Sequence, residues 1–152
     1  AKEYGVNTRF IELAGEVNTT MPYWVLGKIT DALNEHSKSL RNSKVLILGI
    51  AYKKDVDDMR ESPAVKLMQL LEEKGAVIDY SDPYIPIFPK MEEVYFDLKS
   101  IELIPENIVR YDLLLLVTNH SKFDYKLLKK HAKLIVDTRG VYLDSSSNIV
   151  RA

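Results

Sequence analysis

The chain of 152 residues has the length of one domain with a sizeable core, and 46% hydrophobic and 28% charged residues are an ordinary globular balance. A net charge of −1 offers no broad basic field for nucleic acid, and no apolar run has the length of a membrane span, so we expect neither partner. The absence of cysteine excludes disulfides, thiolate metal sites and cysteine nucleophiles. No signal peptide is visible, and we expect a cytosolic setting.

Residues 8–36 carry apolar side chains at steps of three and four, a spacing that predicts a helix. Pro22 interrupts the pattern and is expected to break or kink the helix near Thr20. The apolar stripe includes Tyr23 and Trp24 and is broader than a small domain can bury. We therefore expect a partner, either a further part of the protein or a second subunit. The alternative is a helix that folds back on its own domain.

Strand-like and helix-like segments alternate along the rest of the chain. Because strands that alternate with helices form parallel sheets with right-handed crossovers, we predict an α/β fold: a Rossmann-like, doubly wound parallel sheet preceded by a long helix. Residues 145–147 are predicted to form a turn or tail. Strands are expected over residues 44–50, 76–80, 111–118 and 134–137 and near 94–96, and helices over 64–74, over 124–132 and from Pro105.

The loop over residues 49–63 is the most informative part of the chain, because ligands in open α/β sheets bind just beyond the carboxyl ends of the strands. It follows the first predicted strand and carries two lysines, an arginine, an aromatic ring and three aspartates. This mixture suits an anionic ligand with hydroxyl groups. Ser62 is expected to cap the next helix, with Pro63 at its first position.

Two arginines are further candidates for ligand binding. Arg139 follows the last predicted strand, so it is expected to converge on the same crevice as Lys53. Arg60 lies further along the first loop, and its guanidinium can fork across a phosphate or a carboxylate. The alternative for Arg60 is an ion pair with Asp57 or Asp58 that only stiffens the loop.

Other polar residues at strand ends are expected to be structural. The first strand ends in Gly49-Ile50-Ala51 without the extra glycines of a dinucleotide site, so Asp82 is expected to form an Asp-Pro turn rather than to bind ribose. Thr118 is likewise expected to be structural, although its position leaves contact with a nucleoside open. The three histidines lie far apart without metal-ligand spacing, and we expect them on the surface, with no metal site: His36, His120 and His131.

The pattern of residues 49–63 resembles the start of the C-terminal domain in the UDP-glucose/GDP-mannose dehydrogenase family. Three further segments fit the same family: Ser81-Asp82-Pro83, Phe88-Pro89-Lys90 and Lys122-Phe123-Asp124-Tyr125. The resemblance covers about residues 10–151, and only about the last third of a family member. It implies a central connecting and dimerisation helix region over residues 1–40 and a UDP-sugar-binding, Rossmann-like domain over residues 41–152.

The resemblance also assigns roles to four residues. Tyr52, Lys53 and Arg139 are expected to bind the UDP-sugar, and Arg60 is expected to reach toward NAD, which the N-terminal domain of family members mainly holds. The family oxidises a primary alcohol twice through a cysteine-linked thiohemiacetal and thioester. UDP-N-acetylglucosamine is the expected substrate, with UDP-N-acetylmannosamine or UDP-glucose as alternatives. A non-catalytic nucleotide-binding or dimerisation module is the alternative from another class.

The chain begins with Ala1 and contains no cysteine. We therefore expect a fragment that starts just after the catalytic cysteine motif, with no catalytic residue of its own; a natural stand-alone domain is the alternative. Such a fragment should bind weakly and should not catalyse. The expected partners are a UDP-sugar, the N-terminal NAD-binding domain and a second copy joined through the helix over residues 8–36. Synthesis of polysaccharide or surface-antigen precursors is the family expectation.

Overall fold

The structure is a computed structural model that describes residues 21–144 and 146–152. A helix covers residues 21–35 in this range. The predicted helical residues before Met21, and the break or kink expected near Thr20, lie outside the described residues. The predicted turn over residues 145–147 includes one such residue, Ser145.

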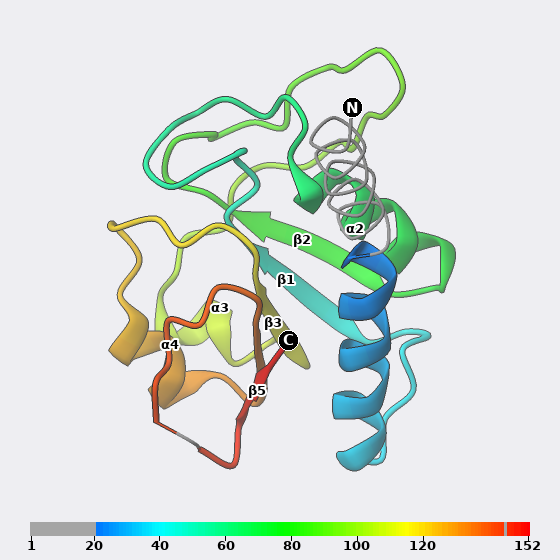
Figure 1. Cartoon of the computed structure of the whole chain (residues 1–152), viewed down its shortest axis with the longest axis vertical. Coiled ribbons are helices and arrows are strands. Elements are labelled where there is room, and N and C mark those ends of the chain that lie inside the picture. Colours follow the sequence, from blue (N-terminus) through cyan, green and yellow to red (C-terminus); the bar gives the residue numbers. More distant parts are fainter. Residues whose placement is uncertain (1–20, 145) are drawn as a thin grey trace, which may run out of the picture.

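A five-stranded parallel sheet lies at the centre of the fold, with the strand order β2-β1-β3-β4-β5 (Figure 1). The strand order reverses between β1 and β3. In open α/β sheets, the ligand crevice lies outside the carboxyl ends of the strands at such a reversal. The strands are β1 (Lys44–Leu48), β2 (Val77–Ser81), β3 (Leu113–Leu116), β4 (Ile135–Asp137) and β5 (Ile149–Arg151).

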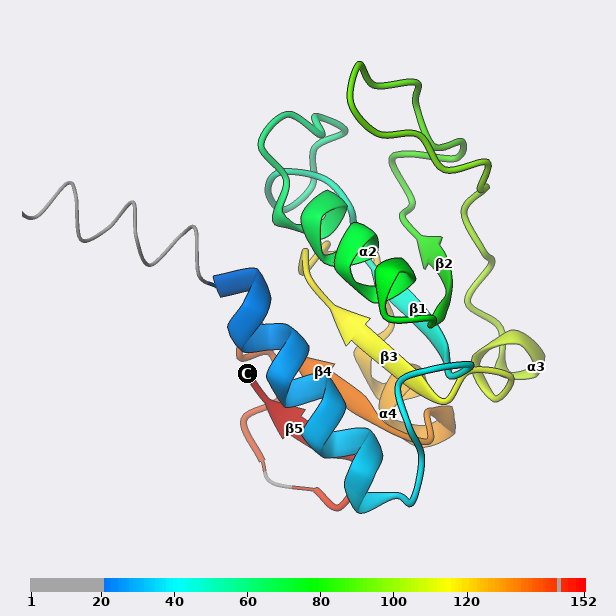
Figure 2. The same cartoon turned by 90° about the vertical axis from the view of Figure 1, so that its right-hand side faces the viewer.

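Helices cover both faces of the sheet, which confirms the predicted doubly wound α/β fold (Figure 2). The helix over residues 21–35 and α2 pack on one face, and α3 and α4 pack on the other. Successive side chains of β1 divide between these two cores, as the alternation of a strand requires. The labelled helices are α2 (Pro63–Glu73), α3 (Pro105–Ile108) and α4 (Tyr125–His131).

Two helices begin at the caps that their sequences provide. Ser62 accepts a hydrogen bond from the amide of Ala64 at 3.3 Å, with Pro63 in the first turn of α2, as predicted. Asp124 caps α4 by accepting from the amide of Leu127 at 3.1 Å. Both loops at the carboxyl edge of the sheet therefore end at a defined residue.

The helix over residues 21–35 packs against its own domain. Val25, Ile29 and Leu33 are buried in the core that also contains α2. The alternative of a folded-back helix therefore holds for these residues. Tyr23 and Trp24 remain 55% and 58% exposed, so the expected partner surface stays a prediction. Within the described part of the chain, no helix is long and apolar enough to cross a membrane.

Two short strands differ from the prediction. No strand forms over residues 94–96; the nearby chain instead makes an isolated antiparallel bridge between Ile87 and Lys99. The edge strand Ile149–Arg151 was not predicted, because three partly exposed residues give no periodic signal. It forms because β4 offers a free edge, on which Ile149 pairs with Ile135.

Candidate functional site

The loop between β1 and α2 carries three of the four predicted site residues. Tyr52 is 52% exposed, and Lys53 and Arg60 are also exposed. The amide of Tyr52 donates to the carbonyl oxygen of Asp58 at 2.6 Å, so the loop closes on itself. The side chains of Tyr52 and Lys53 form no hydrogen bond or ion pair with any residue that the structure describes. Both are therefore available to a ligand.

Arg139 follows β4 in a turn that a buried carboxylate holds. Asp137 Oδ1 accepts hydrogen bonds from the amides of Arg139 and Gly140, both at 2.9 Å, and Oδ2 accepts from the amide of Tyr142 at 2.9 Å. Gly140 has a φ of +70°, a conformation that favours glycine. The exposed Arg139 guanidinium pairs with no side chain in the described part of the chain. Asp137 thus holds the turn that places the Arg139 guanidinium, which pairs with no described side chain, at the sheet edge.

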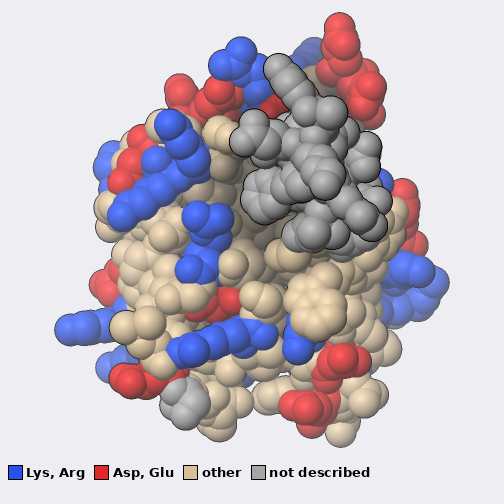
Figure 3. All heavy atoms as spheres, in the orientation of Figure 1, with Lys and Arg blue, Asp and Glu red and all other residues tan. Residues whose placement is uncertain are grey.

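The loops of Lys53 and Arg139 lie on the same edge of the sheet, because β1 and β4 both run parallel to β3. One strand lies between them, so the two strand ends are roughly 10 Å apart at the usual strand spacing. Lys and Arg side chains gather with a few acidic ones on the upper left of the face in Figure 3, the side toward which the arrows of β1 and β2 point in Figure 1. This edge carries the cations that an anionic ligand requires.

Arg60 forms an ion pair with Asp58, which is the pairing predicted as its alternative role. Arg60 Nη2 donates to Asp58 Oδ2 at 2.8 Å, and Nε donates to Oδ1 at 3.1 Å. Hydrogen bonds from Arg60 lower the pKa of the Asp58 carboxyl to about 2. The guanidinium is 88% exposed, so it is paired and still accessible.

Two grooves lie near this edge, and neither contains Tyr52, Lys53 or Arg139. The larger, about 540 Å³, lies between the start of α2 and residues 91–94 and includes Arg60. The smaller, about 290 Å³, lies beside the end of β2 and includes Lys122. The predicted substrate residues therefore lie outside these two grooves.

His120 is buried, and the prediction that places it on the surface is wrong. Its side chain is fully buried, and its Nε2 lies 2.9 Å from Oδ2 of Asp82, which is 1% exposed. Its Nδ1 accepts a hydrogen bond from the amide of Asp55 at 2.9 Å. Because Nδ1 accepts, the ring proton resides on Nε2 and is donated to Asp82. We call this pair the Asp82–His120 clasp. The other two histidines are exposed and partly exposed: His36 and His131.

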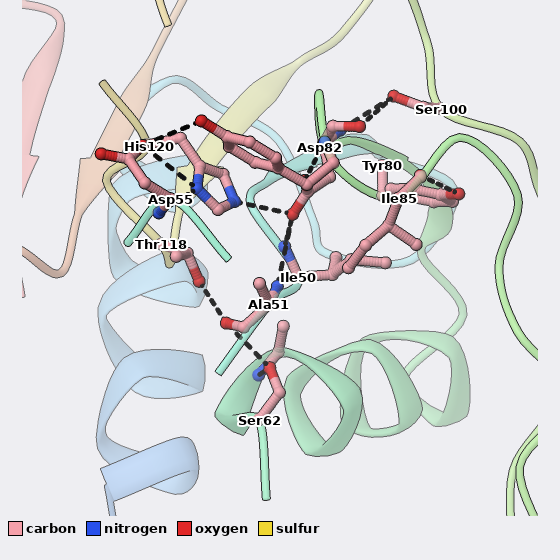
Figure 4. Close-up of polar contacts among 12 residues, drawn as sticks. Ile50, Ala51, Asp55, Ser62, Tyr80, Asp82, Ile85, Ser100, Thr118 and His120 are labelled. Atoms are coloured by element: carbon pink, nitrogen blue, oxygen red, sulfur yellow. Dashed lines mark hydrogen bonds and ion pairs between the residues drawn. The ribbon is translucent and has the colours of Figure 1, made fainter. Parts of the chain in front are cut away.

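Asp82 does more than form the predicted turn. Its Oδ1 accepts from the amide of Tyr84 at 2.8 Å, as an Asp-Pro turn requires. Its Oδ2 also accepts from the amides of Ile50 at 2.9 Å and Ala51 at 3.3 Å (Figure 4). Burial raises the pKa of Asp82, but the hydrogen bonds from His120, Ile50 and Tyr84 outweigh burial and hold this pKa below its usual value. The carboxylate is therefore ionised and joins three strand ends.

The backbone at the end of β1 packs closely against Thr118, shortly after β3. Gly49 has a φ of +82°, and a Cβ atom there would lie 2.6 Å from Cβ of Thr118. The Thr118 hydroxyl donates to the carbonyl oxygen of Ala51 at 2.7 Å, which confirms a structural role. A dinucleotide site needs open backbone at this point. The described residues also contain no group of three or more side chains that could hold a metal ion.

Comparisons with known proteins agree with this architecture. Residues 46–144 match the model of the UDP-glucose/GDP-mannose dehydrogenase family, UDP binding domain. The chain is 32% identical over 145 residues to UDP-N-acetyl-D-mannosamine dehydrogenase of Methanococcus vannielii, covering 89% of this chain and 31% of the relative.

Solved structures show the same likeness. The NDP-N-acetyl-D-galactosaminuronic acid dehydrogenase from Methanosarcina mazei Go1 is 26% identical with a TM-score of 0.71, over 92% of this chain and 30% of that one. The UDP-N-acetyl-mannosamine dehydrogenase from Staphylococcus aureus is 26% identical with a TM-score of 0.69, over 97% of this chain and 33% of that one. The chain thus spans about a third of the length of the relatives it matches.

Proposed function

Because this chain belongs to the UDP-glucose/GDP-mannose dehydrogenase family and contains its UDP-binding domain, we propose that it supplies the UDP site of an NAD-dependent UDP-sugar 6-dehydrogenase. The observation that carries the proposal is the family match over residues 46–144, which includes every predicted site residue. The loops after β1 and β4 add the cations that a diphosphate needs.

The proposed UDP site spans the two loops at the carboxyl edge. Lys53 supplies a compact ammonium charge, and Arg139 supplies a guanidinium that can fork across two phosphate oxygens. Tyr52 offers a ring face and a hydroxyl group to the nucleoside or the sugar. A ligand that spans roughly 10 Å between the strand ends can contact both cations. A nucleoside diphosphate has this extent and charge.

The oxidation itself is assigned to the rest of the protein. This chain contains no cysteine, so a cysteine-linked intermediate requires a residue from outside it. We propose that Arg60, exposed while paired with Asp58, faces an NAD-binding domain supplied by the same protein. The proposed reaction converts the C6 alcohol of the sugar to a carboxylate with two molecules of NAD. Binding of the remote UDP group supplies energy that orients the reacting carbon.

Three UDP-sugars are candidates for the substrate: UDP-N-acetylglucosamine, UDP-N-acetylmannosamine and UDP-glucose. The motifs over residues 49–63 and 122–125 favour UDP-N-acetylglucosamine. The relatives named as UDP-N-acetyl-D-mannosamine dehydrogenases favour UDP-N-acetylmannosamine, which differs from UDP-N-acetylglucosamine in configuration at C2. Oxidation assays of the full-length protein with all three decide between them, and formation of NADH identifies the substrate. No NADH with any UDP-sugar, although the protein binds UDP, would favour a non-catalytic nucleotide-binding module.

The proposal also includes a homodimer joined through the first helix. Tyr23 and Trp24 leave large aromatic surfaces exposed on the helix over residues 21–35. Exposed aromatic surface of this kind is typical of an interface. The ammonium of Lys28 lies 5.0 Å from the centre of the Trp24 ring, and this ring is still 58% exposed.

A further inference from the structure

The β1–α2 loop is anchored on both sides of the residues proposed to bind UDP. On one side, the amides of Ile50 and Ala51 donate to Asp82 Oδ2. On the other side, the amide of Asp55 donates to Nδ1 of His120. Because His120 Nε2 bonds to the same oxygen of Asp82, the two anchors form one unit (Figure 4).

We infer that the Asp82–His120 clasp positions Tyr52 and Lys53 for the diphosphate of UDP, a role that rests on the proposed function. Both clasp side chains are at most 1% exposed, so they cannot touch the ligand themselves. They act through the backbone that carries the exposed Tyr52 and Lys53. Asp82 and His120 are therefore positioning residues.

The backbone at Asp55 is strained, so the hydrogen bond from its amide to His120 helps to hold this conformation. Asp55 has a φ of +62° without being glycine, a conformation that persists only where surrounding contacts impose it. His120 accepts a hydrogen bond from the amide of Asp55. The Asp55 carboxylate accepts from the amide of Ser121 at 2.8 Å and from the hydroxyl of Ser121 at 2.7 Å. Loss of the histidine contact would let the backbone at Asp55 relax and would free Lys53.

The hydrogen bonds of His120 define variants that separate positioning from packing. His120→Phe keeps a ring that can pack near Tyr84 and Phe123, whose rings lie 4.9 and 5.5 Å from the imidazole, but it has no donor or acceptor. His120→Gln keeps one donor and one acceptor separated by a single carbon atom, as in the neutral imidazole. If the clasp positions the loop, glutamine should rescue binding that phenylalanine loses.

The test is calorimetric titration of UDP into this chain and its two variants. We expect His120→Phe to weaken Kd about tenfold or more, the loss expected when binding must re-order one loosened residue. We expect His120→Gln to stay within about threefold of wild type. Ile108→Ala serves as a matched control for stability, because Ile108 is fully buried in α3 before the amino end of β3. It should lower the thermal midpoint and leave Kd unchanged.

The outcomes separate the clasp from the proposed function. A folded His120→Phe variant with the wild-type Kd, or a glutamine variant no better than phenylalanine, would overturn the positioning role alone. No saturable binding by the wild-type chain would overturn the proposed UDP site and the clasp role with it. If the phenylalanine variant does not fold, hydrogen exchange in wild type decides. The Asp55 amide should exchange at least about tenfold more slowly than the Lys54 amide, and equal rates would contradict the anchor.

Discussion

At the scale of single residues, Arg60 forms an ion pair with Asp58 and is still exposed, which is compatible with both of its predicted roles. The ion pair stiffens the loop and leaves the guanidinium at the surface, where another domain can reach it. An exposed pair of this kind contributes little to folding stability, so its effect is better measured at the carboxyl group itself.

Arg60→Ala is predicted to raise the pKa of Asp58 from about 2 toward the ordinary aspartate value, because side-chain hydrogen bonds from Arg60 are the largest cause of the shift. The shift should be incomplete, since the amide at position 60 can still donate to Asp58 Oδ1. An NMR pH titration of the Asp58 carboxyl carbon measures this. Lys54→Ala is the control and should leave the pKa of Asp58 unchanged. A pKa of Asp58 that is still near 2 in Arg60→Ala would contradict the account.

Asp82→Asn is predicted to lower the free energy of unfolding at neutral pH by about 1–3 kcal/mol, the usual cost of leaving a buried hydrogen-bonding group unpaired. The carboxylate accepts from Tyr84 at Oδ1 and from Ile50 at Oδ2. Asparagine replaces one of these oxygens by an NH₂ group, which donates and cannot accept from a backbone amide. Urea denaturation of both proteins at neutral pH measures the loss. Equal stability at pH 7 would show that the carboxylate does not hold the three strand ends together.

The same pair of proteins tests the direction of the Asp82 pKa shift. Because the pKa is lowered in the folded state, its contribution is fully present above the unfolded pKa of about 3.9 and is lost as pH falls through the folded pKa. The stability gap between wild type and Asp82→Asn should therefore narrow below about pH 4. A gap that stays constant down to acid pH would contradict a lowered pKa.

At the scale of elements, the close approach of β1 and β3 depends on Gly49. Gly49→Ala should destabilise the fold by more than about 1 kcal/mol, because its φ is +82° and an added Cβ would overlap Thr118. Gly27→Ala is the control substitution with the opposite expected effect on stability. Gly27 lies in a helix, and an added Cβ would have no described atom beyond its own helix within 4 Å. It should stabilise by about 0.5–1 kcal/mol. Chemical denaturation measures both, and two changes of the same sign would contradict the account.

The elements with strong local signals were predictable, and the long-range polar contacts were not. The four leucines of β3 predict a buried strand because both faces of a parallel sheet are covered, and Ser62-Pro63 predicts the start of α2. The exposed positions of Tyr52, Lys53 and Arg139 could be predicted because each lies in a loop that follows a strand, and their role in binding stays a prediction. His120 was misplaced because its burial depends on Asp82 and Asp55, which are distant in sequence. The signal that would have indicated the clasp is one polar residue directly after β2 and another in the short segment that follows β3.

At the scale of the whole molecule, the exposed face of the first helix is predicted to mediate self-association. Trp24→Glu should shift the chain toward monomer in sedimentation velocity experiments, because it places a charge in a surface that is expected to become buried. Leu143→Glu is the control, since Leu143 is 82% exposed and lies away from the helix in sequence. A wild-type chain that stays monomeric at all concentrations, or a Trp24→Glu variant that associates as wild type does, would contradict the dimer.

The central claim is that the loops after β1 and β4 form one UDP site. The most direct test is a titration of this chain with UDP, followed through its backbone amide NMR signals. We predict that signals of residues 52–55 and 138–140 shift together with one Kd, and that Arg139→Ala weakens that Kd for both loops. Shifts confined to the groove between α2 and residues 91–94, or separate Kd values for the two loops, would contradict the account.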